Sequence, residues 1–222
     1  PAQSPAPPPP PLPVDGASIQ LTIDLDYQAI LQEELTAQLE LTNAISVMGL
    51  ILNPQTGDIL AMATVPDFDP NYPGRGEISW QRNKVITDQF EPGSTFKIVP
   101  LTAAVDQNTV SLWQEFNCEN GSYTYAGHKI RDWDDFGLLT MPQIMENSSN
   151  VGVIKIAETL SQNNLYHYSR DLGFGMHTHI SLAGEQPGTL HQVSEWSKIS
   201  LAEVSLGHEV AVTAFQLGMA YA

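Results

Sequence analysis

Ser94 and Lys97 lie three residues apart, directly after the Glu91-Pro92-Gly93 break. On a helix, residues i and i+3 share one face with Cβ atoms about 5–6 Å apart, so the lysine amine can reach the serine hydroxyl. A serine hydroxyl is a poor nucleophile until a base takes its proton. Lys97 can be that base only if its pKa falls from about 10.4 toward neutrality, which burial in an apolar helix would cause. The position of the pair at a helix start favours catalysis over two unrelated surface residues.

Ser148 and Asn150 form a second candidate element, on a loop between two helical stretches. A hydroxyl and an amide two residues apart on such a loop can point into one cleft. Ser148 can then relay a proton to a leaving amine, and Asn150 can hold a substrate amide or the lysine. The same S-x-N form recurs at 161–163, but Ser161 follows an amphipathic helix, and we interpret it as part of the C-terminal turn of that helix.

A helix and a β-hairpin are expected before Ser94. Asp24 can cap a helix with Asp26 in its first turn, where the helix dipole favours acids. Apolar residues at helical spacing predict one buried face of this helix, formed by Tyr27, Ile30, Leu31, Leu35 and Leu39. Two apolar runs, 45–52 and 59–65, flank the turn-forming residues 53–58 and predict a hairpin with both strands well buried.

Helix signals also place the two candidate elements. A helix should run from Ser94 toward Val105, with a kink at Pro100. The T-x-x-Q sequence at 140–143 has the form of a capping box and predicts a helix that is interrupted at 147–150 and resumes over 152–160.

A second capping box, at 213–216, opens a last helix. The sequence stops inside this helix at Ala222, without a C-terminal signal. We therefore expect the chain to be truncated.

Composition and charge limit the classes of function. The 222 residues carry 9 Lys+Arg against 25 Asp+Glu, a net charge of −16. This charge repels phosphate groups, so we expect no nucleic-acid partner and no docking on anionic lipid. Hydrophobic residues make up 42% of the chain, enough for a sizeable core, and the single Cys118 excludes an internal disulfide and a Cys-based metal site.

The N-terminal segment differs from the rest of the chain. Residues 1–13 contain eight of the 16 prolines, which favour an extended polyproline II conformation. We interpret residues 1–17 as a proline-rich linker or disordered segment, with a proline-rich ligand for a partner domain as the alternative, and residues 18–222 as the folded part.

No metal and no cofactor are expected. Asp132 to Gly137 is similar to the start of a calcium loop, but Phe136 and Gln143 stand where oxygen ligands are needed. His177 and His179 lack a third ligand at metal spacing. The tryptophans at 113, 133 and 196 are interpreted as core or interface residues.

The two candidate elements together resemble a known family. Ser94-Thr95-Phe96-Lys97 is similar to the S-x-x-K motif of penicillin-binding proteins, and Ser148-Ser149-Asn150 to their S-x-N motif. The separation of 54 residues fits, and so do the flanking sequences at 21–24, 53–63, 66–71, 91–94, 147–152 and 207–213. The resemblance covers about residues 18–222 and points to class B, the monofunctional transpeptidases of division or elongation.

This resemblance implies a mixed α/β fold of the penicillin-binding/serine β-lactamase type, an antiparallel sheet with flanking helices plus a helical lobe. It implies peptidoglycan cross-linking by D,D-transpeptidation. Ser94 would attack a stem peptide or a β-lactam, Lys97 would be the base, Ser148 would pass the proton on, and Asn150 would orient Lys97 and the substrate. Division or elongation membrane proteins are implied as partners. The implied location is the periplasm, with an anchor in the full-length protein, although this sequence contains no apolar stretch long enough to span a bilayer.

The sequence departs from the family in one respect. No K-T-G or similar triad follows Asn150, and we expect the strand that carries it to be missing from this chain. Loss of an oxyanion-hole donor lowers rates about 10²–10³-fold, so we expect this chain alone to be inactive and unlabelled by penicillin. Two alternatives stay open: a catalytically inactive scaffold of the same fold, and a serine β-lactamase or β-lactam sensor.

Overall fold

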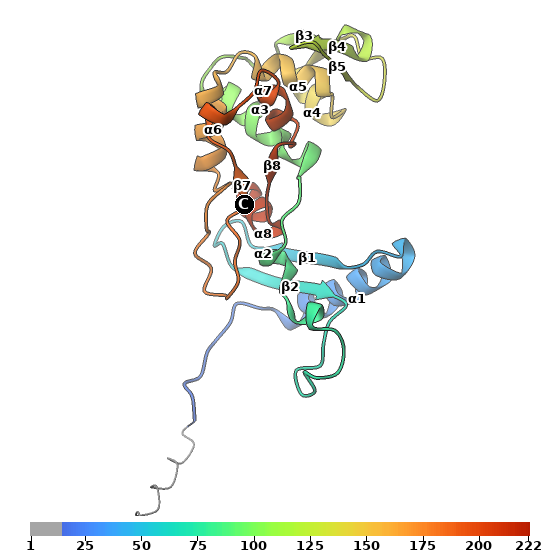
Figure 1. Cartoon of the computed structure of the whole chain (residues 1–222), viewed down its shortest axis with the longest axis vertical. Helices are drawn as coiled ribbons and strands as arrows, with labels where there is room; N and C mark the ends of the chain where they lie inside the picture. Colours follow the sequence, from blue (N-terminus) through green and yellow to red (C-terminus); the bar gives the residue numbers. More distant parts are fainter. Residues whose placement is uncertain (1–14) are drawn as a thin grey trace, which may run out of the picture.

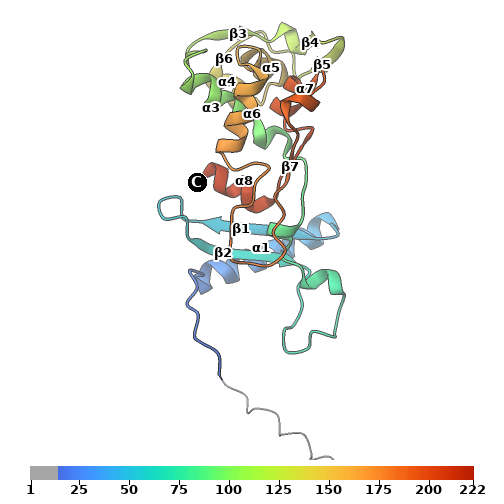
Figure 2. The ribbon, with the colours of Figure 1, turned by 60° about the vertical axis from the view of Figure 1, so that its left-hand side comes forward.

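The computed structural model describes residues 15–222, so most of the segment predicted as a proline-rich linker lies outside the described residues. Two parts follow one another along the long axis (Figures 1 and 2). One part is a β-hairpin covered by the first helix, and the other is a helical lobe that carries small strand pairs at its far end. The last helix lies between the two parts in both views.

The hairpin consists of β1 (Val47–Leu52) and β2 (Ile59–Val65), paired antiparallel with Val47 opposite Val65. The predicted turn at 53–58 joins them and is closed by a hydrogen bond from the Asn53 N–H to the Asp58 carbonyl (2.9 Å). The expectation that both strands are well buried is wrong. Of the two strands, only Ala61 and Ala63 are buried. The other strand residues are partly buried, although α1 packs on one side of the hairpin and α2 and α8 on the other.

Helix α1 (Leu25–Thr42) covers the hairpin. Asp24 caps it as predicted, since its carboxylate accepts hydrogen bonds from the N–H groups of Asp26 and Tyr27. Leu31, Leu35 and Leu39 face the hairpin side and are at least partly buried.

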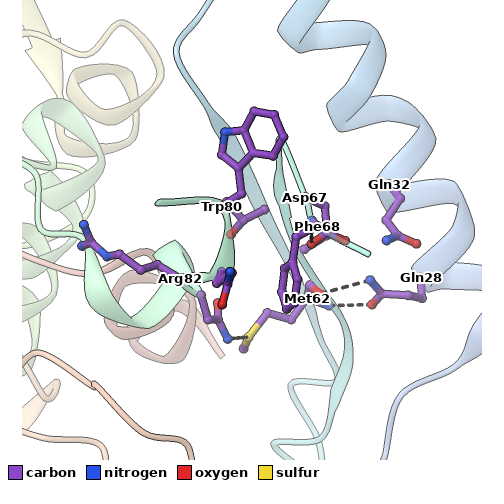
Figure 3. Close-up of a pocket in the computed structure, with 11 residues that line it drawn as sticks. Gln28, Gln32, Met62, Asp67, Phe68, Trp80 and Arg82 are labelled. Atoms are coloured by element: carbon purple, nitrogen blue, oxygen red, sulfur yellow. Dashed lines mark hydrogen bonds between the residues drawn. The ribbon is translucent and has the colours of Figure 1, made fainter. Parts of the chain in front are cut away.

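The other two members of the predicted α1 face, Tyr27 and Ile30, are 48% and 55% exposed, so the buried stripe is narrower than predicted. A polar residue joins it. The Gln28 amide pairs with both the N–H and the carbonyl of Met62 on β2 (Figure 3).

The helical lobe and its connections account for most of the remaining elements. In chain order, the helices and 3-10 turns are η1 (Ile78–Gln81), α2 (Lys84–Thr87), η2 (Gly93–Lys97), α3 (Ile98–Asp106), η3 (Glu119–Gly121), α4 (Met141–Glu146), α5 (Asn150–Ala157), α6 (Gln162–Asp171), η4 (Val193–Glu195), α7 (Ser200–Ser205) and α8 (Ala214–Tyr221). The strands are β3 (Glu115–Asn117), β4 (Ser122–Tyr125), β5 (His128–Arg131), β6 (Leu138–Thr140), β7 (Thr189–Leu190) and β8 (Val210–Ala211).

The strands described here form antiparallel pairs: β1 with β2, β3 with β6, β4 with β5, and β7 with β8. Helix α5 is the centre of the lobe, because α3, α4 and α7 all pack on it. Its residues Val151, Val153, Ile154 and Ile156 are fully buried. The mixed α/β architecture with a helical lobe is therefore confirmed. The lobe places the N-terminal ends of α3 and α5 next to each other.

Several helix boundaries refine the predictions. Both capping boxes are present, at Thr140 and at Thr213. The expected helix at Ser94 begins as the 3-10 turn η2, and Pro100 lies in the first turn of α3, where a missing N–H breaks no helical hydrogen bond. Ser161 is the N-cap of α6 and accepts a hydrogen bond from the Asn164 N–H, so its assignment to a C-terminal turn is wrong.

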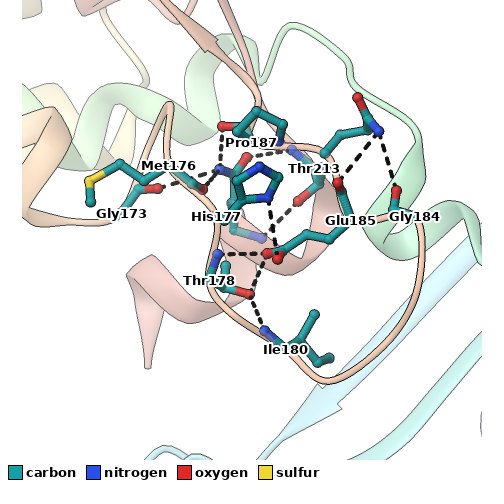
Figure 4. A network of polar contacts seen from close by, with 11 residues as sticks. Gly173, Met176, His177, Thr178, Ile180, Gly184, Glu185, Pro187 and Thr213 are labelled. Carbon is teal, nitrogen blue, oxygen red and sulfur yellow. Dashed lines mark hydrogen bonds and ion pairs between the residues drawn. The ribbon is translucent and has the colours of Figure 1, made fainter.

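The buried Gln216 ties helix α8 to the loop that precedes β7. Figure 4 shows residues of this loop, among them Met176, Glu185 and Pro187. The Gln216 amide donates to the carbonyls of Met176 (2.8 Å) and Pro187 (2.7 Å), while its oxygen accepts the Thr213 N–H (3.0 Å). Glu185 fixes the same loop by accepting hydrogen bonds from the N–H and hydroxyl of Thr178. These contacts join α8, which packs on β1, to the helical lobe.

Of the three tryptophans interpreted as core or interface residues, two lie on the surface and so are not core residues. Trp113 is 79% exposed and Trp133 72%, whereas Trp196 packs against the core beside α7. Within residues 15–222, none of the helices combines the length and the hydrophobicity that a bilayer-spanning segment requires.

Candidate active site

Ser94 and Lys97 occupy the 3-10 turn η2 at the start of α3. In a 3-10 helix the side chains at i and i+3 are eclipsed, so this turn places both on the same side. Their environments differ: Ser94 is exposed to solvent, whereas Lys97 is only 1% exposed. The pair therefore combines an accessible hydroxyl with a buried amine.

The Lys97 ammonium brings the two predicted elements together. Its Nζ lies 2.6 Å from the Ser148 carbonyl oxygen, 3.0 Å from Ser148 Oγ and 2.7 Å from Asn150 Oδ1. Three of the four predicted site residues are thus in direct contact. Ser94 is the fourth, and it is one 3-10 turn from Lys97 without a hydrogen bond to it among the described contacts.

Ser148 is the middle residue of the three-residue connection between α4 and α5, at positions 147–149. Ser148 donates its N–H to the Met145 carbonyl and Ser149 to the Ile144 carbonyl, which is the Schellman ending of α4. Ser148 has φ = 52°, in the left-handed region usually taken by glycine at this position. Ser149 then caps α5 by accepting the Gly152 N–H (2.9 Å). The turn directs the Ser148 hydroxyl and its carbonyl toward the same amine.

The Asn150 amide has a defined orientation. Its Nδ2 donates to the Arg131 carbonyl oxygen at 2.9 Å. A carbonyl can only accept, so the amide nitrogen must face Arg131 and the amide oxygen must face Lys97. The end of β5 therefore determines which atom Asn150 presents to the lysine.

Burial lowers the pKa of Lys97 to about 8, and the negative charge of Asp132 acts in the opposite direction. This is the direction that a general base requires, because it leaves a useful fraction of neutral amine near neutral pH. Burial also raises the pKa of the Cys118 thiol, which lies behind the loop with its Sγ 3.5 Å from Ser149 Oγ. Cys118 is thus an uncharged core residue.

Asp132 is a site residue that the sequence analysis missed. Its carboxylate accepts hydrogen bonds from Ser149 Oγ (2.8 Å), from the Asn150 N–H and from the Val151 N–H (3.1 Å). In the sequence, Asp132 stands out only as the first residue of the segment that is similar to the start of a calcium loop. An acidic residue after a short strand carries no local signal that tells which helix N-terminus it will face.

Gly207 is the second missed residue. It has φ = 81° and ends α7, and its carbonyl accepts the Gly93 N–H at 3.1 Å. A Cβ atom at position 207 would lie 2.1 Å from the Gly93 oxygen. The backbone before Ser94 is therefore set by a close approach that only glycine allows. Gly207 belongs to the 207–213 sequence that resembles the family, but the resemblance did not assign it a role.

The candidate metal ligands do not form a site. In the part of the chain that the structure describes, no three or more His, Cys, Asp or Glu side chains are grouped to hold a metal ion. His177 lies 3.5 Å from Glu185, in the loop fixed by α8.

Comparisons with known proteins agree with this geometry. Residues 47–222 match the family model described as the penicillin binding protein transpeptidase domain. The chain is 33% identical over 207 residues to stage V sporulation protein D of Bacillus subtilis, covering 92% of this chain and 32% of that protein. It is 34% identical over 205 residues to the peptidoglycan D,D-transpeptidase FtsI of Escherichia coli, covering 92% of this chain and 34% of that protein.

A solved structure gives the same result. The transpeptidase domain of penicillin-binding protein 3 from Burkholderia pseudomallei superposes with a TM-score of 0.83 at 30% identity, covering 94% of this chain and 58% of that chain. The chain spans about a third of the length of the curated relatives it matches. Most of its described residues fall within the matched region, and the chain belongs to the penicillin-binding protein transpeptidase family.

Proposed function

We propose that residues 18–222 are part of the transpeptidase domain of a peptidoglycan D,D-transpeptidase that works through an acyl-serine intermediate. The observation that carries this proposal is the contact of the buried Lys97 amine with Ser148 and Asn150, one turn after the exposed Ser94. Nucleophile, base and relay are the three parts that acyl transfer to a serine needs.

In the acylation step, Ser94 Oγ attacks the carbonyl carbon of the penultimate D-alanine of a stem peptide. The Ser94 proton passes to the neutral Lys97 amine as the Oγ–C bond forms. The C–N bond to the terminal D-alanine then breaks, and the leaving nitrogen receives a proton from Lys97 through the Ser148 hydroxyl. Lys97 is neutral again and Ser94 carries an ester.

In the second step, an amine from a neighbouring stem peptide attacks the ester carbon. The amine loses one proton to the Lys97 and Ser148 pair, the ester C–O bond breaks, and Ser94 Oγ regains that proton. The product is the cross-linking amide. A β-lactam stops at the first step, because its ring opens on attack and the leaving nitrogen stays attached to the acyl group.

Labelling with a fluorescent penicillin tests this proposal. The probe is added to this chain and to the longest reading frame that contains it, each with a Ser94→Ala variant as control. We expect a stoichiometric adduct on the peptide containing Ser94 in the longer protein and none in Ser94→Ala. The chain alone is expected to stay unlabelled.

The lifetime of the adduct separates the transpeptidase from the two alternatives. An adduct that persists for many minutes supports a transpeptidase, whereas hydrolysis within seconds would indicate a β-lactamase. No adduct on the longer protein would leave the inactive scaffold as the function. Membrane proteins of division or elongation as partners, and a periplasmic location, are further parts of this proposal that the labelling does not address.

A further inference from the structure

The Asp132 carboxylate contacts the S-x-N element from the residue directly after β5, a strand that contains none of the family motifs. It follows β5 directly, is partly buried, and accepts hydrogen bonds from three consecutive residues, Ser149, Asn150 and Val151. Ser149 is the N-cap of α5 and contributes its hydroxyl, whereas Asn150 and Val151 are the first two residues of the helix and contribute N–H groups that have no partner inside it.

We propose that Asp132 is a positioning residue of this active site, which holds the Ser148–Asn150 turn against Lys97 and stabilises the charged form of that lysine. This inference rests on the proposed function, since it assigns Asp132 a part in the same acylation. Asp132 has no contact with Ser94 among the described residues, so it acts through Lys97 and Asn150.

Two neighbouring residues at the end of β5, Arg131 and Asp132, both accept hydrogen bonds from Asn150. Arg131 holds the Asn150 side chain through its carbonyl, and Asp132 holds the Asn150 N–H through its carboxylate. Both the backbone and the amide of Asn150 are therefore fixed by the end of β5. Because only Asn147 and Ser148 lie between α4 and Ser149, fixing the start of α5 also fixes the turn that faces Lys97.

The electrostatic part follows from the charges around Lys97. Within residues 15–222, Asp132 is the carboxylate whose charge raises the pKa of Lys97 against the effect of burial. The nearby Lys155 and Glu119 pair with each other at 2.6 Å and act on Cys118. The Asp134 carboxylate, two residues along the same loop, accepts only the Asp135 N–H.

If Asp132 acted only as a cap of α5, its loss would have a different effect on Lys97. A cap affects the stability of α5 but does not change the proton affinity of a lysine on another helix. Asp132→Asn separates the two, because an amide oxygen can still accept the N–H hydrogen bonds while the charge is removed. Asp134→Asn is the matched control, since it removes the same charge from the same loop without touching the turn.

The first measurement is the titration of Lys97 by NMR in the chain labelled with ¹³C at lysine Cε. The chain has five lysines, and a Lys97→Met sample identifies the Lys97 signal. We expect a midpoint near pH 8 in the unmodified chain, a midpoint about one pH unit lower in Asp132→Asn, and no change in Asp134→Asn. Asp132→Glu, which restores the charge, should recover part of the shift. An unchanged midpoint in Asp132→Asn overturns the proposal.

The second measurement is the pH dependence of penicillin acylation in the longest reading frame that contains the chain. We expect a lower maximal rate for Asp132→Asn and a profile displaced to lower pH. An unchanged rate and profile overturn the proposal. If no variant is labelled at any pH, the proposed function fails, and the lysine titration still decides the role of Asp132 in this site.

Discussion

Lys97 makes three hydrogen bonds, and the chemistry of its partners determines how it can change protonation state. The Ser148 carbonyl and Asn150 Oδ1 can only accept, so they hold two N–H groups whether the amine is charged or neutral. The Ser148 hydroxyl can accept from the charged amine and donate to the neutral one. Of these three partners, Ser148 Oγ is thus the one that can exchange a proton with Lys97, which agrees with the relay proposed for it.

Ser148 combines this role with a left-handed backbone, and the two can be separated by mutation. Ser148→Ala and Ser148→Gly both remove the hydroxyl, and we expect both to lower acylation by about 10²–10⁴-fold, the usual contribution of a proton-transfer group. Only glycine relieves the backbone at φ = 52°, so Ser148→Gly should be more stable than Ser148→Ala by about 1 kcal/mol. Urea unfolding of the chain gives the stabilities, and penicillin labelling of the longest reading frame that contains it gives the acylation rates. Equal stability of the two variants would show that the turn is not strained.

At the residue scale, sequence predicted the four candidate catalytic residues and missed the residues that contact their segments. Ser94, Lys97, Ser148 and Asn150 could be found because their types and spacing are local. Asp132 and Gly207 could not, because their contacts join segments far apart in the chain. The surface position of Trp133 was also not predicted. Its indole N–H donates to the Asn147 carbonyl, a contact between segments that the sequence does not show to be close.

At the element scale, the same type of helix ending occurs at both sides of the site. The chain leaves α4 at Ser148 and leaves α7 at Gly207, two residues after each helix, and both residues have positive φ. Each is followed by a segment that contacts the candidate catalytic residues or the residues next to them. Beyond Gly207, the chain pairs with the strand-like segment before Ser94, since Phe90 and Val212 exchange both backbone hydrogen bonds. Ser94, the proposed nucleophile, is therefore positioned by the residues after α7 as well as by α3.

Gly207→Ala tests this positioning. The added Cβ would lie 2.1 Å from the Gly93 oxygen, so the segment before Ser94 must move. We expect a loss of stability of more than 1 kcal/mol and a fall in penicillin acylation of about 10²-fold or more, since misplacement by about 1 Å can have that effect. Gly57→Ala is the control, because φ is also positive (76°) and no atom lies within 4 Å of its added Cβ. Equal acylation by the two variants would contradict the role of Gly207.

Sequence predicted the elements best where their signals are local. The capping boxes at 140–143 and 213–216 and the cap at Asp24 are complete within a few residues, and the structure contains all three. The burial of β1 and of the α1 face depends on what covers them from elsewhere. For that reason, the predicted burial of Tyr27 and Ile30 was wrong.

At the scale of the whole molecule, the hairpin and the helical lobe meet through α8, and the candidate site residues lie in the lobe. The site residues rest on the core around α5 and on a second cluster formed by Phe96, Val99, Ala157, Leu165, Phe174, Leu201, Val204, Val210 and Val212. This core encloses Lys97 in a chain whose net charge is −16. The stability of the folded state is therefore coupled to the protonation of one buried amine.

The sign of this coupling follows from the two pKa values of Lys97. The folded value is about 8, and the unfolded value is about 10.4. Below pH 8 both states hold the proton, and the folded state bears the full penalty of a buried charge. Between pH 8 and 10.4 only the unfolded state holds it, so the free energy of unfolding rises with pH. A difference of about two units corresponds to about 3 kcal/mol.

Lys97→Met isolates this contribution from other groups that titrate at alkaline pH. The variant loses the hydrogen bonds to Ser148 and Asn150 at every pH, so that loss is a constant. We expect the free energy of unfolding of the unmodified chain, minus that of Lys97→Met, to increase by up to about 3 kcal/mol from pH 7.5 to 10.5 in urea titrations. Lys198→Met makes the same substitution at an exposed lysine and serves as the matched control. Parallel curves for the unmodified chain and Lys97→Met would mean that the fold does not lower the pKa of Lys97, and without that shift the lysine has no advantage as a base for Ser94.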